Sequence, residues 1–343
     1  MVSRKRDKRA SGRVTLDDVA LAAGVSRMTV SRALRGDRKV ALELVERSTQ
    51  AAERLGYVPD PAARALASSK SSHVAILIPL LSNQLFVDLL EGVQHTLLPA
   101  GYQTLMGVTH YEASEEEQLL KGFLMHRPAG LLVTGSEHSE STRQLIVKSN
   151  IPCVHLMETL AQDGMYSVGF SQSNAARAMT QHLIDTGRRR IAFAAAQLDP
   201  RTLQRAQGYR NCLREAGLYD ATLEWQNPAP SSLKVGNTMF EQILCMRPRV
   251  DAIFFCNDDL AQGGLLAALR MGIKVPRQVS IAGFNDLPGS SEFIPSLTTI
   301  KTPRWEIGVR AAKMLLQLMR DEPVTEPNVD LGFELLVRQS TAT

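Results

Sequence analysis

The stretch LAAGVSRMTVSRAL places two arginines and three hydroxyl side chains within a short segment of helical composition. The guanidinium groups of Arg27 and Arg32 have the fork geometry that bonds guanine O6 and N7, and Thr29 and Ser31 are suited to phosphate oxygens. Met28 offers only apolar contact, for instance to a thymine methyl. These side chains have the chemistry needed to read duplex DNA. An ordinary helical hairpin with a solvated basic face would have the same composition.

Three short helices are expected to position these side chains. Thr15 begins the first helix with the spacing of a capping box. Gly24 breaks that helix at a turn that a Cβ would strain. Ser26 is suited to cap the second helix, and a third helix is expected from about residue 42 to residue 55. This arrangement predicts a helix-turn-helix domain over residues 15–58.

Positive charge is concentrated in the N-terminal part of the chain. Residues 1–70 hold 15 Lys+Arg and 8 Asp+Glu, a balance of +7; the rest holds 24 and 27, a balance of −3, which gives the total of +4. A basic head on a slightly acidic body indicates that only the head contacts a polyanion. Residues 1–14 are expected to form a basic, disordered arm.

Composition also bears on the compartment. The basic tail is followed by VTLDDVA rather than by an apolar run, so no secretion signal is expected. No stretch approaches the roughly 20 apolar residues that span a bilayer. The four cysteines are scattered, which favours buried free thiols in a reducing cytoplasm.

Strand-like and helix-like segments alternate from His73 onward. VAILIPL, QTLMGVT, GLLVTG and IPCVHLM form one series of strands, and YSVGF, RRIAFAAA, DAIFFCN and QVSIAGF form a second. Such alternation predicts parallel sheets with helices on both faces, here in two doubly wound lobes. A ligand is expected in the cleft between the lobes, beyond the carboxyl ends of the strands. Residues 59–72, which contain two prolines and ARALAS, are predicted to be a hinge helix and linker.

Taken in order, these motifs resemble the LacI/GalR family of bacterial transcription regulators. The resemblance runs from Thr15 almost to the C-terminus and includes LGYVPDPAARALAS, LDPRTLQRAQGYRNCL, AIFFCNDDLAQG and KVPRQVSIAGFND. It implies an all-α helix-turn-helix headpiece joined to a body like the periplasmic sugar-binding proteins. That body, residues 73–343, would bind an effector and dimerise.

The resemblance also implies roles for particular residues in DNA binding. Arg27 and Met28 would read bases, and Arg32 would contact a base or a phosphate. Leu66 matches the leucine that family members insert into the minor groove from paired hinge helices, although it could also be a plain packing residue. The full set of expected DNA contacts is Thr15, Arg27, Met28, Thr29, Ser31, Arg32 and Leu66.

Arg205, three residues before Gly208, matches the family's effector-binding arginine. A guanidinium suits a carboxylate or a vicinal diol. Many relatives carry aspartate where Asn285 stands, and this loss of negative charge would suit an anionic ligand. The other expected effector contacts are Phe86, Glu158, Asn257 and Asp286.

The segments SRMTVSRAL, LLSNQLF, HLMET and LDPRT most resemble the gluconate-utilisation repressor branch. The effector implied is a sugar acid: gluconate, a ketogluconate or a phosphorylated form. The resemblance implies a homodimeric repressor that binds a pseudo-palindromic operator and is released by the effector. Because no leucine heptad follows FELLVRQSTAT, we expect a dimer rather than a tetramer.

Other classes share some of these features. A sugar-binding receptor has the same body but would need a secretion signal and no headpiece. A regulator of this type that responds to another sugar or to a nucleobase stays open. An enzyme is not expected, since there is no GxGxxG after the first strand, no P-loop, no GxSxG and no metal spacing of histidines. We therefore expect no catalytic residue, cofactor or metal, and we explain Asp258 and Asp259 by helix capping. The expected location is the bacterial cytoplasm.

Overall fold

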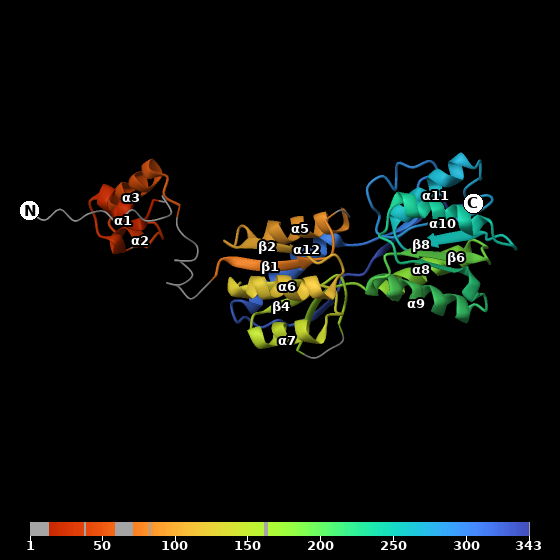
Figure 1. Cartoon of the computed structure of the whole chain (residues 1–343), viewed down its shortest axis with the longest axis horizontal. Coiled ribbons are helices and arrows are strands. Elements are labelled where there is room, and N and C mark those ends of the chain that lie inside the picture. The colour runs from red at the N-terminus through yellow and green to blue at the C-terminus, as the bar shows by residue number, and fades with distance from the viewer. Residues whose placement is uncertain (1–13, 38, 59–70, 82–83, 161–163, 343) are drawn as a thin grey trace, which may run out of the picture. The chain divides into compact units, whose positions relative to one another are not determined.

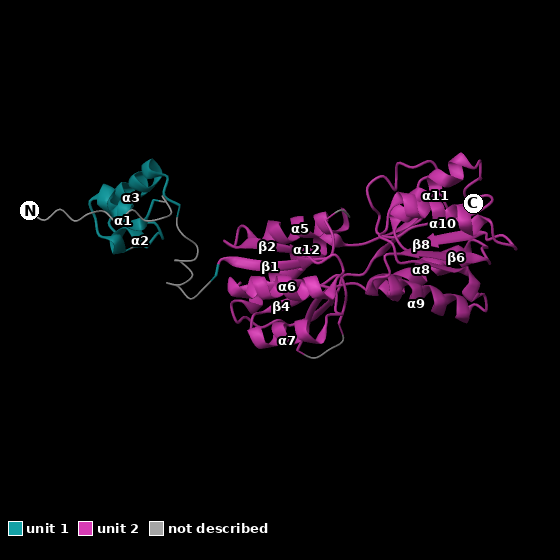
Figure 2. Ribbon diagram, in the orientation of Figure 1, with its two compact units in different colours: residues 1–71 teal, residues 72–343 magenta. Residues whose placement is uncertain are grey.

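The computed structural model contains two compact units, residues 1–71 and residues 72–343 (Figures 1 and 2). We call them the headpiece and the body. Most of the predicted arm (1–14) and hinge (59–72), including Leu66, lies outside the described residues. The structure describes residues 14–37, 39–58, 71–81, 84–160 and 164–342.

The headpiece contains α1 (Leu16–Ala23), α2 (Arg27–Ala33) and α3 (Leu42–Leu55). The capping box at the start of α1 is formed as predicted: Thr15 Oγ1 accepts from Asp18 N at 3.4 Å, and Asp18 Oδ2 accepts from Thr15 N at 2.9 Å. The three helices bury one small core, which is made by Val19, Ala20, Ala23, Val30, Ala51 and Ala52.

Gly24 sets the angle between α1 and α2. Its φ of +64° is left-handed, a conformation that costs any residue with a Cβ about 1–2 kcal/mol. A Cβ at Gly24 would also lie 2.9 Å from Nη2 of Arg47, which donates a hydrogen bond to the carbonyl oxygen of Ala23 at 2.6 Å. Arg47 thereby ties α3 to the end of α1, and the turn has room only for glycine.

The first lobe of the body is built on a parallel six-stranded sheet of order β11-β5-β4-β3-β1-β2. Helices cover both of its faces, as the sequence predicts. Alternate residues of β1 show why: Val74, Ile76 and Ile78 pack into the core under α5 and α12, while Ala75 and Leu77 pack on the other face under α6 and α7. The strands are β1 (His73–Ile78), β2 (Gln103–Val108), β3 (Gly130–Thr134), β4 (Cys153–Leu156), β5 (Tyr166–Gly169) and β11 (Asn328–Asp330), and the helices are α5 (Gln84–Leu97), α6 (Ala113–Met125), α7 (Glu140–Ser149) and α12 (Arg304–Leu318).

The second lobe has a parallel four-stranded sheet of order β7-β6-β8-β9. The pairs α8–α9 and α10–α11 lie on opposite sides of it (Figure 1). Its strands are β6 (Ile191–Ala196), β7 (Glu224–Asn227), β8 (Ala252–Phe255) and β9 (Ser280–Ala282), and its helices are α8 (Gln172–Asp185), α9 (Pro200–Glu215), the short η1 (Ala221–Leu223), α10 (Leu233–Leu244) and α11 (Asp258–Arg270). The prediction of two doubly wound lobes is confirmed.

The structure adds to the sequence prediction in two places. The helix α9, which carries Arg205, begins at Pro200, because Asp199 caps it and proline suits the first helical position. Two three-residue strands, β10 (Thr299–Lys301) and β12 (Glu334–Leu336), form an antiparallel pair that the alternating pattern does not reveal.

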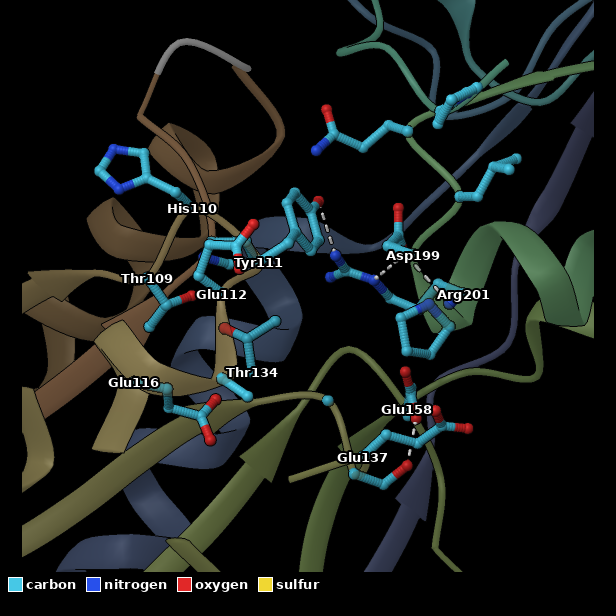
Figure 3. Close-up of a pocket in the computed structure, with 18 residues that line it drawn as sticks. Thr109, His110, Tyr111, Glu112, Glu116, Thr134, Glu137, Glu158, Asp199 and Arg201 are labelled. Carbon is cyan, nitrogen blue, oxygen red and sulfur yellow. Dashed lines mark hydrogen bonds and ion pairs between the residues drawn. The ribbon is translucent and has the colours of Figure 1, made fainter. Parts of the chain in front are cut away.

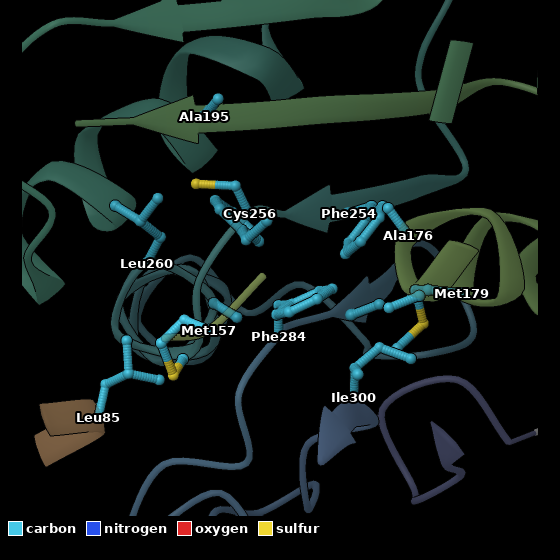
Figure 4. Close-up of a cluster of buried hydrophobic side chains, with 14 of the residues drawn as sticks. Leu85, Met157, Ala176, Met179, Ala195, Phe254, Cys256, Leu260, Phe284 and Ile300 are labelled. Atoms are coloured by element: carbon cyan, nitrogen blue, oxygen red, sulfur yellow. The ribbon is translucent and has the colours of Figure 1, made fainter. Parts of the chain in front are cut away.

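The chain passes between the lobes after β5, before α12 and after β11. Aromatic and thioether side chains fill the region around these passages. Phe170 and Phe284 stack with ring centroids 6.4 Å apart, and Figure 4 shows Phe284 among Met157, Met179 and Ile300. One buried apolar cluster therefore includes residues of both lobes.

The cysteines are free, as expected, but Cys245 is exposed rather than buried because it follows the last turn of α10. Among the described residues, no helix has the length and apolar character needed to cross a membrane.

The packing of α8 against α9 predicts the effect of a single methyl group. A Cβ at Gly208 would lie 2.1 Å from the carbonyl oxygen of Ser173, whereas a Cβ at Gly122, within α6, would meet nothing within 4 Å. Gly208→Ala is expected to lower the free energy of unfolding by about 1–3 kcal/mol, since α9 must move away from α8. Gly122→Ala is expected to raise it by about 0.5–1 kcal/mol. Urea denaturation followed by circular dichroism measures both, and equal effects would contradict the packing described.

Candidate functional site

The helix α2 exposes several of the side chains that are predicted from the sequence to contact DNA. Met28 is 71% exposed and Arg27 is exposed, whereas Val30 and Ala33 are buried in the headpiece core. Thr29 is partly occupied, since its amide donates to Ser26 Oγ at 3.1 Å and its hydroxyl lies 2.8 Å from the same oxygen. The outward face of α2 is therefore formed by Arg27, Met28 and part of Ser31 and Arg32.

Both arginines of α2 lie beside carboxylates. Arg32 Nε donates to Asp37 Oδ2 at 2.8 Å, and Arg27 Nε lies 3.7 Å from Asp17 Oδ1. Exposed pairs of this kind contribute about 0–1 kcal/mol, so a phosphate or a base edge can replace either carboxylate at small cost. Thr15, by contrast, has its hydroxyl bonded to Asp18 Oδ2 at 2.8 Å.

Two adjoining cavities lie between the lobes of the body. Their lining residues follow the carboxyl ends of the strands of both sheets, where the sequence predicts a ligand. They have volumes of about 430 and 310 Å³, and both fall in the range of small-molecule sites. We call the larger the acidic cavity, because Glu112, Glu116, Glu137 and Glu158 line it, and the smaller the arginine cavity, because Arg205 lines it. Four residues line both: Tyr111, Gln197, Asp199 and Arg201.

Arg205 is 3% exposed, and its hydrogen-bond partners among the described residues are all neutral. Its Nε donates to Gln172 Oε1 at 2.8 Å, and its Nη1 donates to the Cys256 carbonyl and to Asn257 Oδ1, each at 2.7 Å. The guanidinium carbon lies 3.8 Å from the centre of the Phe284 ring. Burial lowers the pKa of Arg205 to about 10, so the group stays cationic at neutral pH.

Asn257 and Asn285 continue this network. Asn257 Oδ1 also accepts from Asn285 Nδ2 at 2.9 Å, while Asn285 Oδ1 is buried without a hydrogen-bond partner in the described part of the chain. Asp286 lies elsewhere: its Oδ1 pairs with Arg338 Nη2 at 2.8 Å, and it lines neither cavity. Asp258 does not cap α11 but accepts from the Leu287 amide at 2.7 Å and from two hydroxyls.

Arg201 and Tyr111 stand where the two cavities meet. Arg201 Nη2 donates to the Tyr111 hydroxyl at 2.9 Å, and Figure 3 shows the two side chains pointing toward one another. Arg201 is 5% exposed, and its Nη1 has no hydrogen-bond partner among the described residues. Its guanidinium carbon lies 5.5 Å from the centre of the buried Phe86 ring, so Phe86 supports Arg201 and itself lines neither cavity.

The sequence reasoning missed Arg201 and Tyr111. For Arg201 a signal was present, because it precedes Arg205 by four residues and so shares its helical face. For Tyr111 the sequence holds no such signal, because it lies in a loop after β2 with a φ of +64° that no residue pattern predicts.

Glu158 lies in the acidic cavity, as expected for a group that accepts hydroxyls. Its Oε2 accepts from Ser136 Oγ at 2.7 Å, and it is 4% exposed. Close by, His155 Nδ1 bonds the carbonyl oxygen of Gly135 at 2.9 Å, and His138 Nδ1 bonds Glu116 Oε1 at 2.8 Å. Burial lowers the pKa of His155 to about 4. No cluster suited to a metal ion occurs among the described residues.

Comparison with known proteins agrees with this architecture. Residues 15–60 match the family described as bacterial regulatory proteins, lacI family, and residues 180–341 match the periplasmic binding protein-like domain. The chain is 51% identical over 339 residues to the HTH-type transcriptional regulator GntR of Pseudomonas aeruginosa, which covers 98% of this chain and 99% of the relative. The chain belongs to the LacI family.

Solved structures of the family extend the likeness to three dimensions. The transcription regulator GntR from Chromobacterium violaceum is 46% identical, with a TM-score of 0.77, over 78% of this chain and 99% of that one. A LacI-family regulator from Silicibacter pomeroyi is 34% identical, with a TM-score of 0.90, over 96% of this chain and 100% of that one. The protein is thus a DNA-binding transcriptional regulator, and its relatives are regulators rather than enzymes.

The buried His155 predicts a pH dependence of stability. Its folded pKa of about 4 lies below the value of about 6.5 in an unfolded chain, so its contribution is complete above pH 6.5 and is lost as the pH falls toward 4. Between pH 7 and pH 5 the wild type should lose about 2 kcal/mol more unfolding free energy than His155→Asn, whose amide keeps the bond to Gly135. Denaturant titrations at both pH values measure this, with the exposed His126→Asn as control; superimposable profiles for wild type and His155→Asn would contradict it.

Proposed function

We propose that the protein is a homodimeric repressor of sugar-acid catabolic genes, released from its operator by gluconate or a ketogluconate. The observation that carries the proposal is the charge of Arg205. A buried cation without a direct anionic partner is costly, and the hydrogen-bond partners of this guanidinium among the described residues are all neutral oxygens. Asp199 and Asp259 line the same cavity, but neither carboxylate forms an ion pair with Arg205. A ligand carboxylate would supply the missing charge.

The arginine that joins the two cavities supports the same ligand class. Arg201 Nη1 is an unused, buried donor, although Arg201 Nε pairs with Asp199 Oδ1 at 3.3 Å. Asp199 also accepts from the amides of Arg201 and Thr202 at the α9 N-terminus. A carboxylate in the arginine cavity would therefore meet two guanidiniums. Glu158 and the other carboxylates of the acidic cavity would accept the hydroxyls at the far end of a sugar acid.

Calorimetric titration tests the effector. D-gluconate should bind, and D-sorbitol, which lacks the carboxylate, should bind about 100-fold more weakly. Arg205→Gln should weaken D-gluconate binding about 10- to 100-fold, since a hydrogen bond to a charged group contributes about 1.5–3 kcal/mol. Arg205→Lys should retain part of the affinity, because it keeps the charge but not the fork.

Arg210→Gln is the matched control, because Arg210 lies on the same helix but pairs with Glu224 at 2.6 Å, away from both cavities. It should leave the affinity unchanged. Tight binding of a neutral disaccharide or a purine in place of any sugar acid would contradict the proposed effector and leave the family assignment intact.

For operator recognition we propose that the face of α2 enters the major groove. Arg27 and Met28 would read bases, Arg32 would leave Asp37 for a base or a phosphate, and Ser31 with Thr29 would contact phosphates. Thr15, whose amide and hydroxyl both bond Asp18 Oδ2, would lie beside the phosphate backbone at the start of α1. Leu66, outside the described residues, keeps its proposed place in the minor groove.

Operator variants test the role of Arg27. Arg27→Ala should relax the preference for one base pair in each half-site, at a cost of about 1–3 kcal/mol for the preferred sequence. Arg54→Ala removes one equally exposed charge from the last turn of α3 and should not change any base preference. Fluorescence anisotropy with single-base operator variants measures both. Uniform weakening by Arg27→Ala over all variants would show that Arg27 contacts only phosphate.

The proposed organisation follows the predicted boundaries: an arm (1–14), a helix-turn-helix domain (15–58), a hinge and linker (59–72) and an effector-binding, dimerising body (73–343). Two headpieces would bind half-sites of a pseudo-palindrome in the bacterial cytoplasm. Effector binding would close the lobes, separate the paired hinges and lower the affinity for DNA.

A further inference from the structure

Arg304 links the two lobes of the body behind the arginine cavity. On the first-lobe side, its Nε and Nη2 lie 2.8 and 2.7 Å from Asp88 Oδ2, on α5. On the second-lobe side, its Nη1 donates to the carbonyl oxygen of Asn285 and, at 3.3 Å, to Thr302 Oγ1. The Arg304 side chain is 11% exposed and that of Asp88 is 32% exposed, so the pair is partly shielded from water.

The position of Arg304 is unfavourable for a cation taken alone. It is the first residue of α12, where the helix dipole and the free amides favour negative charge. Asp88 offsets this, because it brings a carboxylate from α5 to the start of α12. The pair is therefore needed where it stands, and neither side chain is a freely solvated surface charge.

Asn285 connects this ion pair to the effector arginine. Its side chain bonds Asn257, which bonds Arg205, while its carbonyl oxygen receives Arg304. Its φ is +107°, a conformation that L-residues rarely adopt and that is sustained only where the surroundings fix it. Asn285 lines neither cavity, so a ligand that contacts Arg205 or Asn257 would act through the Asn285 side chain on the peptide group that Arg304 holds.

The helices α5 and α12, which carry Asp88 and Arg304, are packed rigidly against each other. A Cβ at Gly92 of α5 would lie 2.3 Å from the Trp305 carbonyl oxygen, and a Cβ at Gly308 of α12 would lie 2.2 Å from that of Leu89. The two helices are thus in backbone contact and must move together. The α5 side chains pack on Val74, Ile76 and Ile78 of β1, the first strand after the predicted hinge.

We infer that Arg304, held by Asp88, is a positioning residue that transmits occupancy of the arginine cavity to the α5–α12 pair and so to the operator response. This inference rests on the proposed function, since it assumes an effector that reaches Arg205 and Asn257. It assigns Arg304 and Asp88 to coupling rather than to binding, because neither lines either cavity.

The test separates binding from coupling in the full-length protein. Calorimetry gives the affinity for D-gluconate, and fluorescence anisotropy gives the operator Kd without and with saturating D-gluconate. Arg304→Gln and Asp88→Asn should keep the D-gluconate affinity within about threefold, yet the ratio of the two operator Kd values should fall at least about tenfold toward 1. Arg310→Gln is the control. Arg310 also lies on α12, but it forms an exposed ion pair with Glu326 at 3.6 Å, so its loss should leave the ratio unchanged.

Each other outcome decides against the inference. A wild-type ratio in both variants would show that the ion pair carries no coupling. A joint loss of D-gluconate affinity and thermal stability in both variants would show that the pair only holds the lobes in place.

If the wild type does not respond to D-gluconate, the proposed effector is wrong, and a measurement without ligand decides the inference. A double-mutant cycle combines Asn285→Ala with Asp88→Asn and measures operator affinity. Coupling predicts that the double variant departs at least about threefold from the product of the single effects, whereas independent effects would overturn it.

Discussion

The body is organised around a buried positive charge whose hydrogen-bond partners in the described part of the chain are all neutral. Arg205 is held by amide and carbonyl oxygens and by the face of Phe284, all of which fix its orientation without cancelling its charge. Such an arrangement stabilises the folded state less than an ion pair or an apolar residue would. It is the arrangement expected where an anion must bind and also leave, since Arg205 has a fixed orientation and forms no ion pair with Asp199 or Asp259, the two carboxylates that line the same cavity.

The packing within each lobe is rigid around that site, whereas some contacts between the two lobes can rearrange. Within the second lobe, the Gly208 contact holds α9, and with it Arg201 and Arg205, against α8. Within the first, Gly92 and Gly308 hold α5 against α12. Besides the apolar cluster around Phe170 and Phe284, the lobes are connected by polar contacts: Arg304 with Asp88 and Asn285, Arg201 with Tyr111, and Gln172 Nε2 with the Met157 carbonyl at 3.2 Å. Hydrogen bonds and ion pairs can exchange partners, whereas backbone packing cannot.

Local patterns in the sequence were enough to predict the headpiece and the alternating core of the body. Capping residues and left-handed glycines act over three or four positions, so Thr15, Ser26, Gly24 and Gly56 mark helix ends directly. Asp199 and Pro200 mark the start of α9 in the same local way, since aspartate caps the helix and proline suits its first position. The short strands β10 and β12 pair across more than thirty residues of chain, and three-residue strands carry no periodicity to detect.

The site was predictable only in part, for a related reason. Three of the expected residues converge: Asn257 follows β8, Asn285 follows β9 of the same sheet, and Arg205 lies on α9 beside that sheet. Asp286 follows the same strand but pairs with Arg338. Its backbone has a φ of +50°, which directs the side chain away from the network and cannot be predicted from the sequence pattern. Contacts between lobes, such as Arg304 with Asp88, join residues 216 positions apart and are set by the assembled fold alone.

The central claim is that one metabolite and one DNA site compete through the same protein, and reciprocity tests it most directly. The Kd of D-gluconate is measured for the free protein and for the protein saturated with operator DNA. The account predicts that DNA weakens D-gluconate binding by the same factor by which saturating D-gluconate weakens DNA binding. Equal affinity of D-gluconate for the free and the DNA-bound protein would contradict it.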